Sequence, residues 1–300
     1  MKVISPQKPI VRTKIYRAGK FEFPLGLRTY LVGILNVTPD SFSDGGRYFD
    51  HALAVEHARR MLELGADIID VGGESTRPGS IPIDAETELA RVIPVVEKIR
   101  KACDCPISVD TGKSTVARAA LEAGASIIND INGLQADPCL APAIARHQAG
   151  VILMHNARLY RGGDESAVPG QGLIAGVRTF LKESCRIAAE AGVLPDNMML
   201  DPGIGFGVTA EESIRMIACL EELQDIGLPI LIGPSRKRFI GHILGHCETD
   251  RLIGTCAAVV MGIARGADFV RVHDVREIAE AARVADAIER ASPPERRRRR

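Results

Sequence analysis

The chain has 300 residues, of which 46% are hydrophobic, and equal numbers of basic and acidic residues give it a formal net charge of zero. This length fits either two average domains or one barrel of roughly 250 residues. No apolar run approaches the ~20 residues that span a bilayer, and the charged, proline-containing start MKVISPQKPIVRTK is unlike a signal peptide. We therefore expect a cytoplasmic protein with no membrane partner.

The cysteines and the charge distribution exclude further classes of protein. The seven cysteines are scattered and form no CxxC pair, which argues against a disulfide framework and a zinc knuckle. Without its five terminal arginines the chain has 33 basic and 38 acidic residues, and we expect residues 291–300 to be a disordered basic tail. No basic stripe is interleaved with aromatic residues, so no nucleic-acid partner is predicted.

Residues 1–28 are expected to form an N-terminal extension. The segment KIYRAGKFEFPLG carries a central Ala-Gly pair between alternating apolar residues, which predicts a β-hairpin that covers the bottom of the following domain.

From residue 29 onward, the chain repeats one pattern: an amphipathic helical stretch, often a glycine break, and a short aliphatic run that ends in polar residues. Eight strands are predicted near residues 31–37, 67–71, 106–109, 126–131, 151–155, 198–201, 229–233 and 268–272, and helices between them over 51–65, 85–101, 113–124, 175–192 and 211–223. Strands that are hydrophobic throughout are buried on both faces, and helical crossovers imply parallel pairing. The pattern predicts a single (β/α)8 TIM barrel over residues 29–290, with a doubly wound open sheet as the alternative that periodicity does not exclude.

Polar side chains follow almost every predicted strand, and on a barrel they would converge at one mouth. These positions are Asn36, Glu74 to Arg77, Asp110, Asn129, Asp130, His155, Asn156, Asp201, Ser235 to Lys237 and Arg271 to Asp274. Taken singly, Asp110 is explained as a helix cap and Asp201 as a turn residue. Together they favour a ligand, because unpaired buried polar groups cost ~1–3 kcal/mol each. The mixture of acids, amides and cations suits a flat heterocycle that carries an anion.

Metal-binding and nucleotide-binding motifs indicate which cofactors the chain could hold. His155 and His273 are the only histidines at strand ends, and the absence of HxH and HExxH argues against a tightly held zinc ion. Mg²⁺ is expected instead, because it binds through a few oxygens and substrate phosphates. The glycine-rich loops match neither the P-loop nor GxGxxG, so no nucleotide site is predicted.

Three motifs are specific enough to indicate a family. GILNVTPDSFSDGG (Gly33–Gly46), DVGGESTRPGS (Asp70–Ser80) and DPGIGFG (Asp201–Gly207), followed in order by SVDT, IND, SRK and RVHD at their expected places, resemble the dihydropteroate synthases of the pterin-binding family. The resemblance implies a transferase of folate biosynthesis, of the kind that sulfonamides target, commonly homodimeric and dependent on Mg²⁺. Its small-molecule substrates would be 6-hydroxymethyl-7,8-dihydropterin pyrophosphate and p-aminobenzoate.

The same resemblance implies a division of labour among the strand-end residues. Pterin binding falls to Asp110, Asn129, Asp201, Lys237, Arg271, Ile34, Ile131, Met154, Phe206 and Gly233, with Arg271 stacked on the ring. Pyrophosphate binding falls to Asn36, Arg77, Arg271 and His273, with Asn36 as the metal ligand. The p-aminobenzoate site comprises Pro39, Phe42, Ser75, Thr76, Arg77, Lys237 and Arg238, and the catalytic residues would be Asp110, Asp44, Arg77 and Lys237.

Three positions depart from the family pattern and keep an alternative open. Val208 stands where lysine is common, Ser213 where asparagine is common, and Arg238 where many members have serine. A catalytically impaired paralogue that retains the pterin pocket is therefore the alternative prediction. A pterin-dependent methyltransferase domain is a third, although the TPDSF and STRP loops favour the synthase.

Overall fold

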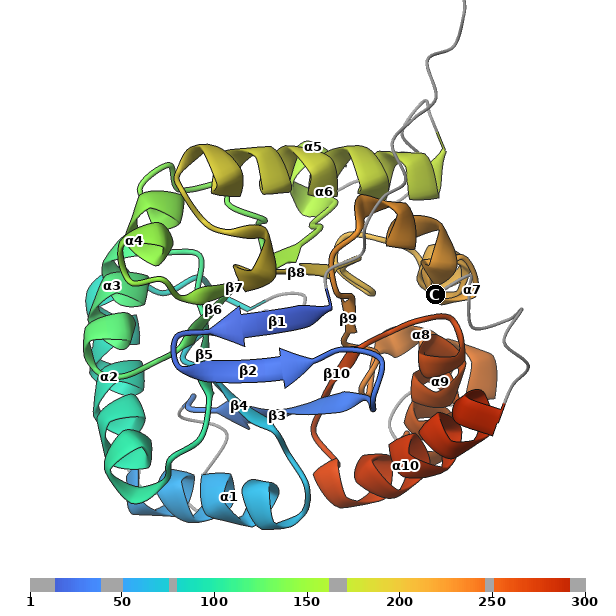
Figure 1. The fold of residues 1–300 in the computed structure, drawn as a ribbon, viewed down its shortest axis with the longest axis horizontal. Helices are drawn as coiled ribbons and strands as arrows, with labels where there is room; N and C mark the ends of the chain where they lie inside the picture. Colours follow the sequence, from blue (N-terminus) through green and yellow to red (C-terminus); the bar gives the residue numbers. More distant parts are fainter. Residues whose placement is uncertain (1–13, 39–50, 76–79, 162–171, 246–250, 292–300) are drawn as a thin grey trace, which may run out of the picture.

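The computed structural model describes residues 14–38, 51–75, 80–161, 172–245 and 251–291. Figure 1 looks into a ring of strands that is enclosed by a ring of helices. The eight parallel strands are β3 (Tyr30–Asn36), β4 (Ile68–Gly72), β5 (Ile107–Asp110), β6 (Ile127–Asp130), β7 (Gly150–Met154), β8 (Met198–Asp201), β9 (Leu231–Ile232) and β10 (Phe269–Val272).

The strands follow chain order around the barrel, β8-β7-β6-β5-β4-β3-β10-β9. The seam between β8 and β9 is closed by a parallel bridge between Leu200 and Ile230, and the Leu200 amide donates to the Pro229 carbonyl at 2.9 Å. The predicted (β/α)8 barrel is confirmed.

The helices lie outside the strands and connect them (Figure 1). They are α1 (His51–Glu63), α2 (Ala85–Ala102), α3 (Ser114–Glu122), α4 (Leu140–Arg146), α5 (Arg158–Arg161), α6 (Leu173–Glu190), α7 (Ala210–Ala218), α8 (Arg238–Leu244), α9 (Leu252–Ala264) and α10 (Val275–Ala291), with 3₁₀ segments η2 (Pro195–Asn197) and η3 (Leu220–Ile226). Within the described residues, no helix is long and apolar enough to cross a bilayer.

Side chains alternate along each strand between the space under the helices and the barrel interior. The outer cluster takes residues such as Leu31, Ile69 and Ile107. The inner cluster takes Tyr30 and Val32 from β3 and one residue from each of six other strands: Ile68, Ile127, Ile152, Met199, Leu231 and Phe269. The period of two therefore decides which side chains can reach a site at the barrel mouth.

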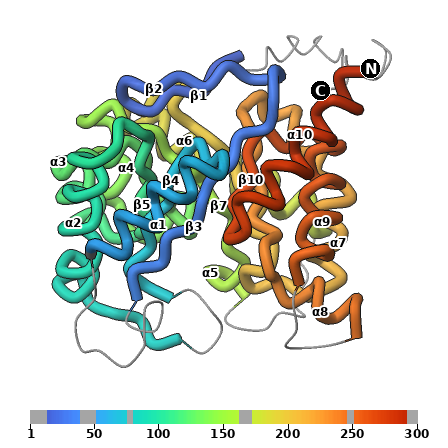
Figure 2. Tube along the Cα trace, turned by 90° about the horizontal axis from the view of Figure 1, so that it is seen from below, coloured from blue at the N-terminus to red at the C-terminus, as the bar shows by residue number. Residues whose placement is uncertain are grey.

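The predicted hairpin is present and covers the N-terminal end of the barrel (Figure 2). Strand β1 (Ile15–Ala18) pairs antiparallel with β2 (Phe21–Pro24). Tyr16 and Phe23 join the inner cluster, where the Tyr16 ring meets the edge of Phe269 at 5.6 Å and Phe23 meets Tyr30 at 5.2 Å. A Cβ at Gly150 would collide with the Tyr16 hydroxyl, so this close packing requires glycine.

All predicted strand bounds agree with the structure to within two residues, but one strand is shorter than expected and one helix ends earlier. The strand expected over 229–233 is reduced to Leu231–Ile232, since Pro229 has no amide to donate. The helix expected over 211–223 ends at Ala218 and continues as η3. Leu220 and Leu223 are both buried there, and the three-residue turn of a 3₁₀ helix places them on one side.

Candidate active site

The C-terminal strand ends surround one cavity. It is lined by Asp110, Asn129, Ile131, Met154, Asp201, Ile204, Phe206, Gly233, Lys237 and Arg271. Nine of the ten residues that the resemblance assigns to pterin binding belong to this lining. The tenth, Ile34, is buried on β3 and does not contribute to it, while Ile204 was not predicted. Residues from five strands and the loops that follow them are thus brought together.

Arg271 spans the floor of the cavity between two carboxylates. Its Nε donates to Asp70 Oδ2 at 2.7 Å and its Nη2 to Asp110 Oδ2 at 2.9 Å. Asp70 is fully buried, and the same oxygen also accepts from Asn129 Nδ2 at 3.3 Å. Burial raises the pKa of Asp110, and the nearby Arg271 cation opposes that shift. In this structure Arg271 pairs with acids at the position where the resemblance implies stacking on a ring.

Asp201 and Lys237 form the second charged part of the cavity. Asp201 ends β8 and accepts the Gly203 amide at 2.7 Å, and burial raises its pKa to about 6. The Lys237 ammonium lies 4.0 Å from the centre of the Phe206 ring, a cation–π distance. Burial, with a further contribution from Arg271, lowers the pKa of Lys237 to about 8. Both groups are therefore poised to change charge near neutral pH.

The DPGIGFG loop owes its shape to three glycines in the left-handed backbone region. Gly203, Gly205 and Gly207 have φ values of 77°, 77° and 68°. A Cβ at Gly203 would collide with the His155 carbonyl, and one at Gly207 would lie 2.6 Å from the Arg158 amide. Only glycine fits these positions, so the motif brings the backbone close to the cavity wall.

His155 supports this loop from outside the cavity. Its Nδ1 lies 3.0 Å from the Pro202 carbonyl and its Nε2 lies 2.8 Å from the Tyr160 hydroxyl, so the neutral ring donates to one and accepts from the other. Burial lowers the pKa of His155 to about 4. The adjacent Arg161, also buried, pairs with Glu212 through two 2.8 Å hydrogen bonds. These residues hold the loop and do not line the cavity.

The residues expected to bind pyrophosphate lie at the adjoining edge. Asn36 ends β3, and a Cβ at Gly72 would lie 3.7 Å from its Oδ1 and 4.0 Å from Asp110 Oδ2. Two oxygens from neighbouring strands therefore lie close to Gly72 at this edge. His273 follows β10, and its Nδ1 lies 2.9 Å from Ser235 Oγ.

Few of the residues expected to bind p-aminobenzoate are described. Pro39, Phe42, Asp44, Thr76 and Arg77 lie outside the described residues. Ser75 is half-buried, and its carbonyl accepts from Ser80 Oγ at 2.5 Å. Arg238 is exposed at the first turn of α8 and does not line the cavity.

The two remaining departures from the family pattern lie away from the cavity. Val208 is 6% exposed and packs in the outer cluster, and Ser213 Oγ donates to the Thr209 carbonyl at 2.8 Å. Neither change removes a group from the strand-end cavity.

The cavity is nearly filled by its own side chains. It encloses about 20 Å³ of free space, whereas pockets that bind small molecules usually hold ~300–1,000 Å³. Arg271 and Lys237 belong to its lining, and we expect their side chains to move when a ligand enters.

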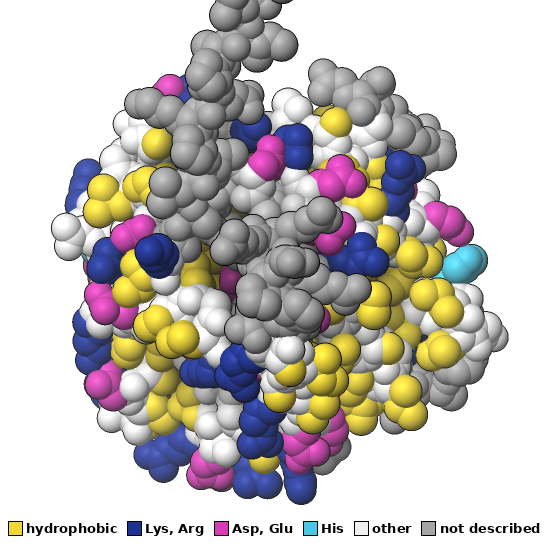
Figure 3. Space-filling model, turned by 45° about the vertical axis from the view of Figure 1, so that its right-hand side comes forward, with side chains coloured by type: hydrophobic (Ala, Val, Ile, Leu, Met, Phe, Trp, Pro, Cys, Tyr) yellow, Lys and Arg dark blue, Asp and Glu magenta, His cyan; other side chains and the backbone are white. Residues whose placement is uncertain are grey.

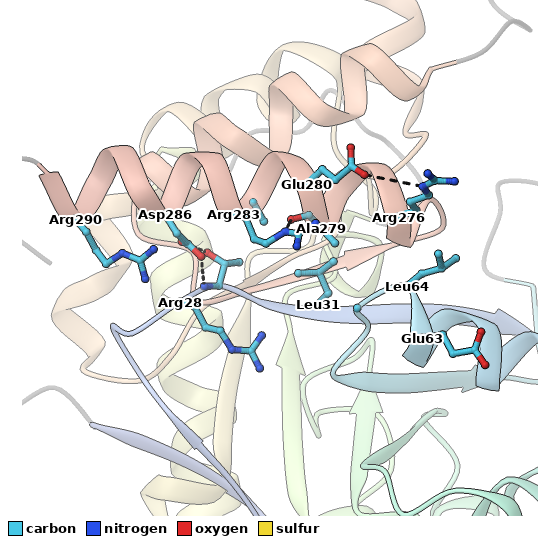
Figure 4. Close-up of a pocket in the computed structure, with 13 residues that line it drawn as sticks. Arg28, Leu31, Glu63, Leu64, Arg276, Ala279, Glu280, Arg283, Asp286 and Arg290 are labelled. Carbon is cyan, nitrogen blue, oxygen red and sulfur yellow. Dashed lines mark hydrogen bonds and ion pairs between the residues drawn. The ribbon is translucent and has the colours of Figure 1, made fainter.

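A larger groove of about 630 Å³ lies at the opposite end of the barrel, between the end of α1, the start of β3 and α10 (Figure 4). Its polar groups pair with one another: Asp286 accepts from the amide and hydroxyl of Thr29, both at 2.8 Å, and Arg276 lies 4.0 Å from Glu280. The contacts of Asp286 with Thr29 attach α10 to the segment before β3, whereas the Arg276–Glu280 pair lies within α10. We assign the chemistry to the smaller cavity, because the strand-end residues meet there.

Asp70 is the main residue that the sequence analysis missed. It belongs to the quoted DVGGESTRPGS motif but lies within a strand, so it was not counted among the strand ends. The signal was available, because Ile68, Asp70 and Gly72 share one face of β4 and an acid on an interior face needs a partner.

A barrel whose strand ends present paired acids and cations around a cavity defines a class, the α/β-barrel enzymes that bind small polar molecules at this end. The family described as pterin binding enzyme matches residues 32–273. The dihydropteroate synthase of Clostridium beijerinckii is 46% identical over 275 residues, which cover 91% of this chain and 99% of that protein.

Solved structures agree. Dihydropteroate synthase from Clostridium difficile, in the presence of pteroic acid, has a TM-score of 0.84 and 46% identity, covering 89% of this chain and 99% of that one. The Xanthomonas albilineans dihydropteroate synthase with 4-aminobenzoic acid has a TM-score of 0.85 and 40% identity, covering 93% and 99%. The chain belongs to the pterin-binding enzymes, within the dihydropteroate synthase family, and is a transferase.

Proposed function

We propose that the chain condenses 6-hydroxymethyl-7,8-dihydropterin pyrophosphate with p-aminobenzoate to give 7,8-dihydropteroate and pyrophosphate. The observation that carries this proposal is the cavity in which Asp110, Asn129, Asp201 and Lys237 meet. The relatives' structures with pteroic acid and with 4-aminobenzoic acid support the choice of substrates.

The polar groups of the cavity suit the pyrimidinone edge of a pterin. Ionised Asp201 can accept from amino and ring N–H groups, and Lys237 can donate to a ring carbonyl. Asn129 offers a donor and an acceptor on one amide. Ile131, Met154 and the other apolar lining residues would cover the ring faces. Each donor and acceptor of the heterocycle then has a partner that water would otherwise supply.

Arg271 has to exchange partners when the pterin binds. In the structure its guanidinium satisfies Asp110, which is also a proposed pterin ligand. Asp70 can retain Arg271 through the Nε contact, leaving Asp110 free to accept from the ring. Nη2 also lies 2.7 Å from Asp70 Oδ2, so Asp70 can keep this nitrogen as well. The guanidinium face and Nη1 can then contact the ring face and the leaving pyrophosphate, which joins the two roles that the resemblance assigns to Arg271.

The bond change requires no covalent enzyme intermediate. The bond between the exocyclic methylene carbon and the pyrophosphate oxygen breaks, and its electron pair stays on the departing pyrophosphate. The aniline nitrogen bonds to that carbon and loses a proton to water. The electron-rich pterin spreads the developing positive charge, and the carboxylate of Asp110 stabilises it. Asp44 and Arg77, beyond the described residues, are proposed to assist at the p-aminobenzoate side.

Mg²⁺ is proposed as the cofactor because the oxygen groups at the strand edge fit its preferences. The Oδ1 of Asn36 lies beside Gly72 at the end of β3, and Mg²⁺ is typically bound by one or two protein oxygens together with substrate phosphates and water. When bound, the ion would neutralise charge on the departing pyrophosphate. Arg271 and His273 are proposed to bind the same phosphate oxygens.

We also propose a homodimer, based on an apolar stripe on α9. Ile253 and Met261 are 84% and 49% exposed, and with Ala257 they recur every four residues, so they lie on one face of the helix. Figure 3 shows hydrophobic side chains gathered on this side of the molecule, and Ile243 on α8 is 60% exposed. Light scattering should report a dimer for the wild-type chain and a monomer for Ile253→Glu; a monomeric wild type would remove this proposal.

A cytoplasmic location is proposed as well, because the charged pyrophosphate substrate does not cross a bilayer unaided. Fractionation of the producing cells should recover the protein and its activity with the cytoplasm, and recovery in another compartment would contradict it.

The test of the function is turnover. Purified protein with Mg²⁺ and both substrates should form dihydropteroate, identified by mass, and release pyrophosphate in equal amount. A folded protein that binds the pterin without forming product would instead indicate the impaired paralogue.

A further inference from the structure

An ion triad joins two neighbouring βα units beside the cavity. Lys113 Nζ lies 2.5 Å from Glu74 Oε2 and 2.5 Å from Glu88 Oε2. Glu88, on α2, is 1% exposed, while Glu74 and Lys113 are 24% and 32% exposed. Burial alone lowers the pKa of Lys113, but the hydrogen bonds to both carboxylates outweigh it and raise this pKa, so the amine stays charged. None of the three residues lines the cavity.

The triad belongs to a set of contacts that fixes the backbone after β4. Arg91 on α2 donates from Nη1 to the Gly73 carbonyl at 3.0 Å. A Cβ at Gly73 would lie 2.6 Å from Val92 Cγ2, so α2 packs directly on this backbone. One residue later Glu74 is held by Lys113, and the Ser75 carbonyl accepts from Ser80 Oγ. Helix α2 and Lys113 therefore determine where Ser75 lies.

The charges make Lys113 indispensable to this arrangement. Within the described part of the chain, Lys113 is the cation that the structure pairs with both carboxylates. Without it, a nearly fully buried carboxylate would face a second carboxylate, and repulsion between like charges would drive the more exposed Glu74 outward. Glu74 directly precedes Ser75, so any backbone shift that accompanies this movement reaches Ser75.

We infer that Lys113 is a positioning residue for the p-aminobenzoate half of the reaction, acting by holding Glu74 against Glu88. This inference rests on the proposed function, in which Ser75 is one of the residues assigned to p-aminobenzoate. The pterin cavity takes one residue, Asp110, from the end of the strand that precedes Lys113, and Asp110 has its own contact with Arg271. Loss of Lys113 should therefore separate the two substrates kinetically.

The test compares Lys113→Met with wild type. We expect kcat/KM for p-aminobenzoate to fall about 10- to 100-fold, as misplacement by about 1 Å can cause, while calorimetry with 6-hydroxymethyl-7,8-dihydropterin gives a Kd within about twofold. Lys113→Arg should restore most of the activity, because it restores the charge. Lys98→Met, an exposed lysine on α2, is the matched control and should behave as wild type.

A second variant covers the case in which Lys113→Met does not fold. Glu74→Leu removes the same contact at a less buried position and should show the same split between substrates. If Lys113 acts through Glu74, a variant that carries both substitutions should have a kcat/KM for p-aminobenzoate no lower than that of the less active single variant. Independent effects would instead add.

The outcomes separate the two proposals. Wild-type protein that forms no product overturns the proposed function. If the wild type is active, any of three results overturns the inference alone. These are unchanged kinetics in both single variants, a loss of pterin affinity equal to the loss for p-aminobenzoate, or additive effects in the double variant.

Discussion

The two ends of the barrel are built from the same strands but have opposite chemistry. At the N-terminal end, the interior holds Phe269 with Tyr16, Phe23 and Tyr30, an aromatic cluster covered by the hairpin. Two residues along β10, the next interior position is Arg271, which lies between two carboxylates.

Two other strands also change from an apolar to an acidic interior side chain over two residues. Ile68 is followed on the interior face by Asp70, and Met199 by Asp201. Because the period is two, one interior step along these strands leads from the hydrophobic core to the polar site. Stability and chemistry are thereby separated along the barrel axis, and substitutions at each end should affect one and spare the other.

The largest effect is expected at the hairpin end. Phe23→Ala removes a ring that contacts Tyr16, Tyr30 and Phe269, and should lower the free energy of unfolding by ~3–5 kcal/mol. Urea unfolding measures the loss, and kcat/KM at a temperature where the variant is folded should stay within about twofold of wild type. A large loss of activity in the folded variant would show that the ends are coupled.

The next effect is expected at the opposite end. Asp201→Asn keeps the shape and the acceptor for the Gly203 amide but removes the charge that faces the pterin. Pterin affinity should fall about 30- to 150-fold, corresponding to ~2–3 kcal/mol. Calorimetry checks this, while the unfolding free energy should not decrease, since a neutral side chain is easier to bury. Unchanged affinity would remove Asp201 from the pterin site.

The pH dependence of pterin binding sharpens the same assignment. Burial raises the pKa of Asp201 to about 6, so below that pH the carboxyl is protonated and loses acceptor capacity. Burial lowers the pKa of Lys237 to about 8, so above that pH the amine loses its charge. Affinity should peak between these values and fall roughly tenfold per unit beyond each. Burial also raises the pKa of Asp110, the other proposed pterin carboxylate. In Asp201→Asn the acidic limb should therefore weaken, and an unchanged limb would show that Asp201 does not contribute to it.

The smallest effect concerns the hairpin end again. The Tyr16 hydroxyl is fully buried without a hydrogen-bond partner in the described structure, and burial raises its pKa. Tyr16→Phe should therefore leave stability within ~1 kcal/mol of wild type or increase it. Thermal unfolding measures this, and a marked loss would mean that the hydroxyl does have a partner.

Much of the fold could be predicted from the sequence because barrel strands are hydrophobic on both faces and each ends in a polar residue. The failures were local. The strand near Pro229 was shortened by a missing donor, and the helix beyond Ala218 tightened into η3 to bury Leu220 and Leu223. These outcomes depend on packing partners that are distant in the chain.

The site could be predicted less completely than the fold. Strand-end position indicated Asp110, Asn129 and Asp201, and the resemblance supplied the apolar lining. Asp70 was missed because an acid inside a strand has meaning only once its partner Arg271, 201 residues later, is known. The exposed position of Arg238 likewise depends on how α8 begins.

The most direct test of this account is a crystal structure of the protein with a bound dihydropterin. We predict that the ring lies among Asp110, Asn129, Asp201 and Lys237, that Arg271 leaves Asp110, and that it keeps its contact with Asp70. A ring bound elsewhere, or an intact Arg271–Asp110 pair beside a bound ring, would contradict it.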